Sequence, residues 1–162
     1  MTQKLTTCLW LDNQAEEMVE FYKSVFKENF REGDKTFYTT ETPSNKPIGS
    51  VLTYEFEIFG ERFMVLNGGA DFKFNEAISF VINCEDQKEV DYYWEALSAV
   101  PESEVCGWLK DKFGVSWQVT PKRLDEMIKS PDKEAAKRVM DAMLKMKKID
   151  IAELEKAYKG GE

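Results

Sequence analysis

A degenerate internal repeat constrains the fold more than any other feature of this sequence. Residues 59–65 read Phe-Gly-Glu-Arg-Phe-Met-Val, and residues 113–119 read Phe-Gly-Val-Ser-Trp-Gln-Val. Each copy places a turn glycine before an alternating strand pattern, and upstream of each a strand pattern runs into a helix pattern. Two copies of a strand–helix–strands unit predict a duplicated βαβββ architecture, in which paired sheets surround a cavity.

The first copy, residues 1–69, combines one helix pattern with several strand patterns. Apolar residues recur at helical spacing after Asp12 and Asn13, either of which would cap the helix. Alternating residues that turn at Gly60 predict a hairpin. In chain order, the sequence predicts a strand at 5–11, a helix at 14–27, and strands at 30–38, 49–59 and 62–67.

The second copy, residues 77–122, follows the same order with fewer strands. Its first stretch is nearly continuous in apolar residues, which predicts a strand buried on both faces. In chain order, the sequence predicts a strand at 77–84, a helix at 87–100, strands at 104–110 and 115–120, and tail helices at 131–147 and 150–157. We therefore expect an α+β fold, with paired modules in one domain at 1–122 and C-terminal helices at 123–162 packed on it.

The charge of the chain excludes some classes of partner. Thirty acidic residues against 22 basic ones give a net charge of −8, whereas nucleic acids and anionic membranes require a basic surface. The sequence has no apolar run of membrane-spanning length and no secretory signal pattern. We expect a cytoplasmic protein with neither a nucleic-acid nor a membrane partner.

The three cysteines, Cys8, Cys84 and Cys106, do not form a pattern associated with catalysis or metal binding. No two of them have Cys-x-x-Cys spacing, and the chain contains no histidine to activate a thiol. Cys8 and Cys84 lie in apolar strand patterns, so we expect both to be buried structural residues.

Several sequence blocks resemble those of a known family. They include Cys-Leu-Trp-Leu at 8–11, Ala-Glu-Glu at 15–17, Phe-Tyr at 21–22, Arg-Phe-Met-Val-Leu-Asn-Gly-Gly at 62–69, and the longer stretches 72–80, 106–118 and 142–148. These blocks resemble the PhnB-like family, labelled 3-demethylubiquinone-9 3-methyltransferase-like, of the vicinal oxygen chelate (glyoxalase/bleomycin-resistance/dioxygenase) superfamily. The resemblance implies the duplicated fold and a homodimer. Methyl transfer gains no support, because no glycine-rich loop joins a strand to a helix as a Rossmann-type site requires.

The resemblance also locates the positions at which active members of that superfamily bind a divalent metal. Those members use four inward side chains, mainly His, Glu or Gln. The corresponding residues here are Thr7, Met64, Gln118 and one of residues 77–79, for which we take Ser79. Neutral oxygens and a thioether are poor ligands for a hard divalent cation. We therefore expect no metal and no other cofactor, and Gln118 is left as a hydrogen-bonding group for a ligand.

Four aromatic residues on strand patterns provide a second indication of a site. Trp10, Phe63, Trp108 and Trp117 either pack in the core or line a pocket that stacks a flat ligand. The register of the last strand decides whether Trp117 or Gln118 faces inward, and the sequence does not determine it.

These observations favour a metal-independent small-molecule binding protein with an aromatic-lined cavity and no catalytic residue. One alternative is a metal-dependent lyase, isomerase or dioxygenase of the glyoxalase type. Another is a structural or regulatory homodimer whose cavity is filled by its own side chains. The expected partners are a second copy of the chain and an unidentified small molecule. The residues expected to line the cavity are Thr7, Trp10, Phe63, Met64, Ser79, Trp108, Trp117 and Gln118.

Overall fold

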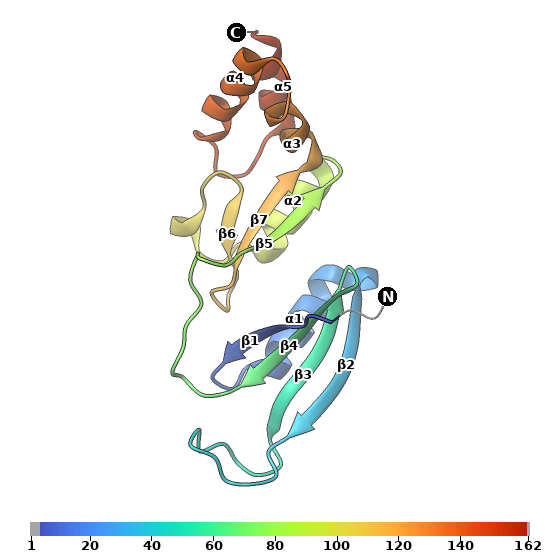
Figure 1. Ribbon diagram of the computed structural model, residues 1–162, viewed down its shortest axis with the longest axis vertical. Coiled ribbons are helices and arrows are strands. Elements are labelled where there is room, and N and C mark those ends of the chain that lie inside the picture. The colour runs from blue at the N-terminus through green and yellow to red at the C-terminus, as the bar shows by residue number, and fades with distance from the viewer. Residues whose placement is uncertain (1–3, 162) are drawn as a thin grey trace. The chain divides into compact units, whose positions relative to one another are not determined.

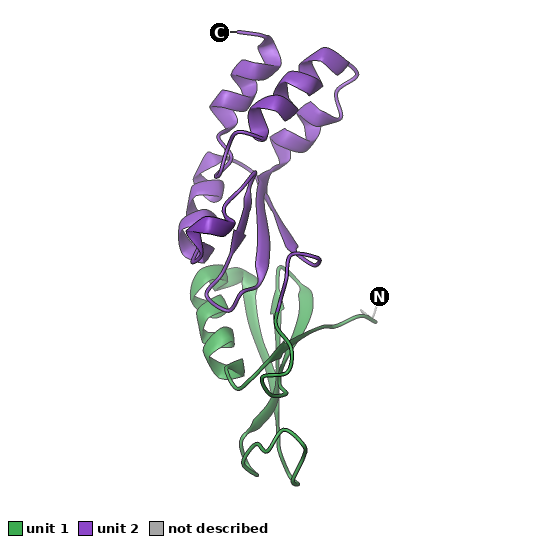
Figure 2. Cartoon of the chain, turned by 90° about the vertical axis from the view of Figure 1, so that its left-hand side faces the viewer, with its two compact units in different colours: residues 1–73 green, residues 74–162 purple. Residues whose placement is uncertain are grey.

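The computed structural model describes residues 4–161 of the chain. Contacts between residues divide the chain into two units, residues 1–73 and 74–162, which Figure 2 shows in separate colours. The first unit holds the first copy of the sequence repeat. The second unit holds the second copy together with the C-terminal helices.

The first unit is a βαβββ module, which confirms the sequence prediction. Its elements are β1 (Thr7–Leu11), α1 (Ala15–Phe26), a short 3₁₀ turn (Lys27–Asn29), β2 (Phe30–Phe37), β3 (Val51–Ile58) and β4 (Glu61–Asn67). The strands form one sheet in the order β1-β4-β3-β2 (Figure 1). β1 is parallel to β4, and the other two pairings are antiparallel.

An aromatic core joins α1 to one face of this sheet. The buried side of the helix includes Tyr22 and Phe26, and Tyr22 lies over Phe56 of β3 with ring centroids 5.9 Å apart. Phe56 in turn stacks on Phe63 of β4 at 5.2 Å and on Phe30 of β2 at 5.5 Å. Each such pair contributes about 0.5–1.5 kcal/mol beyond the apolar area that it buries, so these rings bind the helix to three strands.

The N-terminus of α1 is capped by the sheet. No side chain at the helix start accepts a capping hydrogen bond, so the cap predicted at Asp12 or Asn13 is wrong. Instead, Oδ1 of Asn67, at the end of β4, accepts from the backbone amide of Ala15 at 2.9 Å. Nδ2 of Asn67 donates to the carbonyl of Val51 at 3.0 Å. One buried amide side chain therefore joins α1, β3 and β4.

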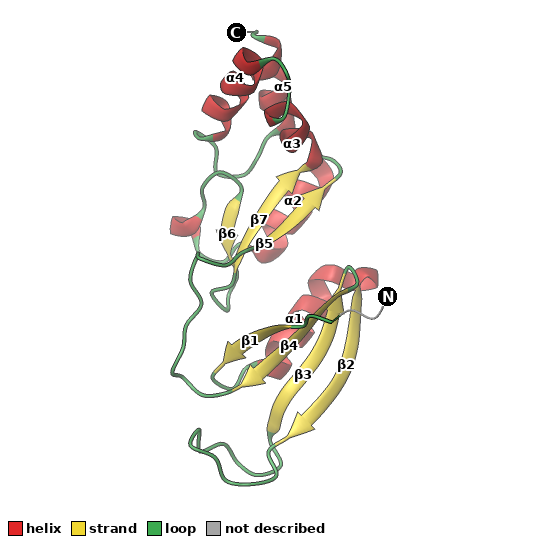
Figure 3. Cartoon of the chain, in the orientation of Figure 1, coloured by secondary structure: helices red, strands yellow, loops and turns green. Residues whose placement is uncertain are grey.

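The second unit contains a shorter module of the same kind. Its elements are β5 (Phe80–Cys84), α2 (Gln87–Leu97), a 3₁₀ turn (Pro101–Ser103), β6 (Trp108–Lys110) and β7 (Ser116–Pro121). The three strands form a sheet in the order β5-β7-β6 (Figure 3). β5 is parallel to β7, as β1 is to β4, and β6 is antiparallel to β7. The lower strand count expected for the second copy is confirmed.

Two predictions for this sheet need correction. The strand predicted at 104–110 begins only at Trp108, because Cys106 and Gly107 have φ values of 50° and 85°, which no strand accommodates. The strand predicted at 77–84 begins only at Phe80. It was predicted to be buried on both faces, but it has one open face: Ile82 is 7% exposed, whereas its neighbour Val81 is 50% exposed. A helix covers only one side of the sheet, so alternate residues of β5 remain accessible.

The tail forms three helices with a small core of their own. They are α3 (Lys122–Ile128), α4 (Lys133–Met143) and α5 (Ile151–Lys159), packed around Leu124, Met127, Val139, Ile149 and Leu154. The helix predicted at 131–147 ends earlier. Residues 146 and 147 instead accept hydrogen bonds from the backbone amides of Cys106 and Gly107, at 2.9 and 2.7 Å. Within residues 4–161, no helix is both long and apolar enough to cross a membrane.

Candidate functional site

Each sheet has one face covered by its helix and an opposite face that the helix leaves uncovered, which we call the open face. Strand alternation assigns every strand residue to one of these faces. In the second unit, Ile82 and Val119 are buried on the helix side, at 7% and 0% exposure. Val81 and Gln118, directly paired across β5 and β7, lie on the open face.

The open face of the second unit brings together three residues that the sequence analysis selected. Nε2 of Gln118 donates to Oγ of Ser79 at 2.9 Å. Trp108 of β6 is the direct cross-strand partner of Gln118, so the indole and the amide share a face at the same level of the sheet. Small-molecule sites commonly combine an aromatic surface with a few polar groups.

Trp117 lies on the opposite face. It is 3% exposed, and its indole N–H donates to Oδ2 of the buried Asp111 at 2.9 Å. The register question that the sequence left open is therefore answered: Gln118 faces the open side, and Trp117 belongs to the helix-side core.

A groove of about 420 Å³ adjoins Trp108 along β6. Its lining consists of Glu76, Glu102, Ser103, Val105, Trp108, Leu109, Lys110 and Ser116. The ammonium group of Lys110 forms an ion pair with Glu76. Together with its own backbone amide, that contact holds the pKa of Glu76 below its ordinary value.

Ser116 is the most unusual residue of this groove. It is 2% exposed, and among residues 4–161 its Oγ has no hydrogen-bond partner. An unsatisfied buried hydroxyl costs about 1–3 kcal/mol. Ser116, Lys110 and Glu76 were not predicted as site residues from the sequence. The sequence did contain one indication of Ser116: in a strand pattern, alternate residues share a face, so Ser116 lies on the same face as Gln118 and Thr120.

In the first unit, the predicted residues divide between the two faces. Met64 and Trp10 lie on the open face, where Met64 pairs with Cys8. Thr7 and Phe63 pair with each other on the helix side, and Phe63 is 7% exposed within the aromatic core. Thr7 therefore does not share a face with Met64, because neighbouring strand residues point to opposite faces.

Trp10 has structural contacts that the sequence did not reveal. Its indole N–H donates to the carbonyl of Gly69 at 2.8 Å, and its ring meets Phe72 edge-on with centroids 5.0 Å apart. The ring also lies directly over Gly68, where an added Cβ would come within 2.4 Å of it. Trp10 therefore holds Gly68 and Gly69, which follow β4, in position.

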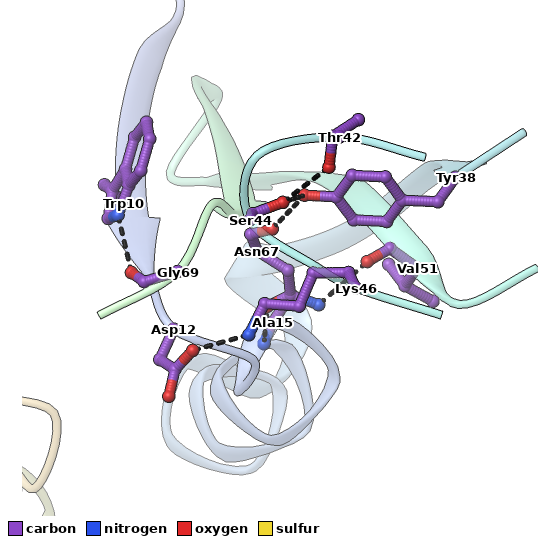
Figure 4. Close-up of polar contacts among 10 residues, drawn as sticks. All are labelled: Trp10, Asp12, Ala15, Tyr38, Thr42, Ser44, Lys46, Val51, Asn67 and Gly69. Carbon is purple, nitrogen blue, oxygen red and sulfur yellow. Dashed lines mark hydrogen bonds and ion pairs between the residues drawn. The ribbon is translucent and has the colours of Figure 1, made fainter. Parts of the chain in front are cut away.

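A second group of contacts in the same unit secures the loop after β2 (Figure 4). Lys46 pairs with Asp12 at 2.5 Å. The hydroxyl of Tyr38 donates to the carbonyl of Asn67 at 2.5 Å and lies 3.2 Å from Oγ of Ser44. These bonds hold residues 38–46 against the ends of β1 and β4.

The residues at the four predicted metal positions are poor metal ligands. Thr7 and Met64 supply a hydroxyl and a thioether in the first unit, and in the second unit the amide of Gln118 donates to the hydroxyl of Ser79. Within the described residues, no group of three or more His, Cys, Asp or Glu side chains is arranged to hold a metal ion. Hydroxyl, thioether and amide donors do not fit the hard divalent cation that the sequence resemblance implied.

Comparison with known proteins identifies the family. The model of the 3-demethylubiquinone-9 3-methyltransferase family matches residues 3–120. The chain belongs to this family. A PhnB protein of Bacillus cereus bearing the same methyltransferase label is 32% identical over 74% of this chain and 99% of its own, with a TM-score of 0.59. The PhnB-like, 3-demethylubiquinone-9 3-methyltransferase-like family predicted from the sequence blocks is thereby confirmed.

Other comparisons add less. A protein from Pseudomonas aeruginosa is similar in fold, with a TM-score of 0.52 at 13% identity, over 74% of this chain and 98% of its own. A comparison with curated proteins gave no significant match. The family match ends at residue 120, so it does not include the three tail helices.

The methyltransferase label of the family does not correspond to a nucleotide-type cofactor site in either module. The turn from β1 into α1 reads Asp-Asn-Gln, and the turn from β5 into α2 reads Glu-Asp. Neither contains a glycine, whereas a Rossmann-type site needs glycines there so that the backbone can approach the cofactor phosphates. The residues present do not fit such a cofactor.

Proposed function

We propose that this chain is a metal-independent small-molecule binding protein whose ligand lies on the open face of the second module. Trp108 provides the stacking surface, and Gln118 and Ser79 provide polar groups. The observation that carries the proposal is the convergence of Gln118, Ser79 and Trp108, the first two joined at 2.9 Å and the third directly opposite Gln118.

The buried hydroxyl of Ser116 supports the same site. A polar atom that the chain leaves unpaired at 2% exposure is a group that a ligand can satisfy. Buried polar groups in proteins are otherwise almost always hydrogen-bonded. Sites of this kind are largely apolar and use a few polar groups to orient the ligand.

A tryptophan fluorescence titration with a library of aromatic small molecules tests the proposal. Ligands that quench the wild-type protein are expected to lose most of that response in Trp108→Phe, and to bind at least about tenfold more weakly to Gln118→Ala, since an orienting hydrogen bond is lost. Trp94→Phe is the matched control, because Trp94 is buried beneath the sheet on α2. Retention of full binding by Trp108→Phe and Gln118→Ala would contradict the proposal.

Metal independence requires its own experiment. Protein purified without an affinity tag is expected to contain no stoichiometric metal and to show no thermal shift with Ni²⁺, Mn²⁺ or Zn²⁺, because thioether, hydroxyl and amide donors bind these ions poorly. A stabilisation of several degrees by any of them would instead favour lyase, isomerase or dioxygenase chemistry.

We also propose that the chain forms a homodimer. The open face of the second module carries Val81, which is 50% exposed, and Ile78 just before the strand is 73% exposed. Such an apolar surface is suited to contact with a second copy. Sedimentation is expected to give twice the 18.8 kDa mass of one chain, and Val81→Glu is expected to shift the protein toward monomer.

A further inference from the structure

We infer that the ligand of the second-module site is a small aromatic carboxylate, and that Glu76 occupies the place of its carboxylate when no ligand is bound. The inference rests on the proposed function, since it concerns the same open face. It is carried by the groove beside Trp108, where a lysine, an unpaired hydroxyl and an exposed intrachain carboxylate meet.

Lys110 and Ser116 form the two halves of a carboxylate-binding pair. They are direct cross-strand partners on β6 and β7, and both line the groove. The Lys110 side chain is 23% exposed, which limits competition from water. A hydroxyl without a partner can donate to a carboxylate oxygen that the neighbouring ammonium also holds, and charge-assisted hydrogen bonds of this kind are the strong ones.

The carboxylate of Glu76 occupies the position that we assign to the ligand carboxylate, and a ligand can displace it. Its side chain is 61% exposed although it pairs with Lys110, and it lies in the irregular segment 74–79 before β5. The hydrogen bond between Gln118 and Ser79 also attaches this segment to β7. An intrachain carboxylate competes at a high effective concentration, so it keeps Lys110 occupied, yet it leaves Ser116 without a partner.

The remaining lining selects an aromatic body for that carboxylate. Trp108 and Val105 supply apolar surface along the groove, and Val105 is 53% exposed. Glu102, the other carboxylate of the groove, forms no ion pair in the described part of the chain. When Glu76 is displaced, the ammonium group of Lys110 is therefore available to a ligand carboxylate, beside the indole of Trp108.

Titration of the full chain with benzoate, followed by tryptophan fluorescence, tests the inference. Glu76→Gln is expected to bind benzoate about tenfold more tightly than the wild type, because the intrachain competitor is gone. Benzamide, the neutral analogue, is expected to bind both proteins equally. Lys110→Met and Ser116→Ala, each combined with Glu76→Gln, are expected to lose that gain. Glu76→Ala provides a second variant with the same expected gain.

Glu102→Gln is the matched control, because it removes an equal charge from the same groove without freeing Lys110. An equal gain in Glu102→Gln and Glu76→Gln would overturn the inference, since general charge would explain both. Absence of any gain in Glu76→Gln and Glu76→Ala would overturn it as well. If benzamide or benzylamine binds at Trp108 while benzoate does not, the carboxylate assignment fails and the proposed site stands. If none of the three binds any variant, the inference fails together with the proposed function.

Discussion

Among single residues, Asp111 accepts three side-chain hydrogen bonds from a fully buried position. Its Oδ1 accepts from the amides of Phe113 and Val115 at 2.9 and 3.0 Å, and its Oδ2 accepts from Trp117. The residue is 0% exposed. Three donors aimed at one carboxylate fix the turn between β6 and β7, and thereby the register that places Gln118 on the open face.

Asp111→Asn tests this role. The amide that replaces Oδ2 is a donor and faces the indole donor of Trp117, so the variant is expected to lose about 1.5–3 kcal/mol of unfolding free energy. Denaturant unfolding monitored by tryptophan fluorescence measures the loss. Asp125→Asn, which changes an exposed i,i+4 pair with Lys129, is expected to stay within about 0.5 kcal/mol. Equal stabilities of the two variants would contradict the assignment.

Cys84 and Cys8 differ in their exposure to solvent, contrary to the sequence prediction. Both were predicted to be buried, but Cys8 is exposed and only Cys84 is buried, because Cys8 lies on the open face. Burial, followed by the nearby carboxylates of Glu89, Asp86 and Glu85, raises the pKa of Cys84 to about 12. At pH 8 its thiol is therefore protonated and unreactive.

Thiol labelling of the native protein at pH 8, followed by peptide mapping, checks this difference. Cys8 is expected to react, while Cys84 is expected to stay unmodified until the protein is unfolded. Cys84→Ser should leave the number of reactive thiols in the native protein unchanged. If Cys84 were modified as fast as Cys8, Cys84 would not lie on the covered face of its sheet.

At the scale of elements, the carboxylate of Glu32 on β2 accepts hydrogen bonds from both α1 and β3. Lys23 of the helix donates to Glu32 of β2 at 2.7 Å, and the hydroxyl of Tyr54 on β3 donates to the same side chain. The hydrogen bonds from Lys23 and then Tyr54 hold the pKa of Glu32 below its ordinary value of 4.5. The folded state thus favours the charged carboxylate.

The lowered pKa predicts the direction of an acid effect. A group whose pKa is lower in the folded state contributes stability above its unfolded value, near pH 4.5, and loses it as the pH falls through the folded value. Between pH 5 and pH 3, the thermal midpoint of Glu32→Gln is therefore expected to fall less than that of the wild type. Glu57→Gln, on the next strand, serves as control. Parallel decreases in wild type and Glu32→Gln would contradict the linkage.

Element types were predictable from the sequence, whereas their ends depended on distant contacts. Periodicity located α1 and α2 within a few residues because the apolar side of each helix must meet a sheet. It extended the strand before Trp108 too far. The positive φ of Cys106 is stabilised by hydrogen bonds that the amides of Cys106 and Gly107 donate to carbonyls of the tail, and no local sequence pattern contains these bonds. The cap of α1 was missed for the same reason, because Asn67 is 52 residues from Ala15.

At the scale of the whole molecule, the tail is attached to the second module through Ile149. This residue is 0% exposed and lies against Gly107, and its carbonyl accepts from Gln87 of α2 at 3.0 Å. The same Gln87 accepts from the amide of Ile151 at 2.8 Å. The tail therefore supports both α2 and the turn before β6, although the family match does not extend to it.

Ile149→Ala in the full chain tests that attachment. Truncating a fully buried isoleucine is expected to cost about 2–5 kcal/mol. The cost should appear as faster hydrogen exchange at the amides of Cys106 and Gly107, with the first unit unchanged. Leu144→Ala is the control, because Leu144 lies on the same tail and is 60% exposed. Unchanged protection of Cys106 and Gly107 would show that the tail does not support the module.

The overall architecture was open to prediction because the repeat and the family blocks extend over most of the chain. The site was only partly predictable. Gln118, Ser79 and Trp108 share a face because the register of β7 is fixed by Asp111, and Asp111 has no special sequence signature. Thr7 and Trp117 were assigned to the cavity, but a one-residue difference in register reverses the face of a strand residue, and no single sequence specifies that register.

The most direct test of the binding account is the indole N–H region of the NMR spectrum, which should hold four signals, from Trp10, Trp94, Trp108 and Trp117. Aromatic fragments added in the presence of a metal chelator are expected to shift the Trp108 signal. The signals of Trp10 and Trp117, which donate to Gly69 and Asp111, and that of the buried Trp94 should stay in place. Fragments that bind but leave the Trp108 signal unmoved would contradict the account.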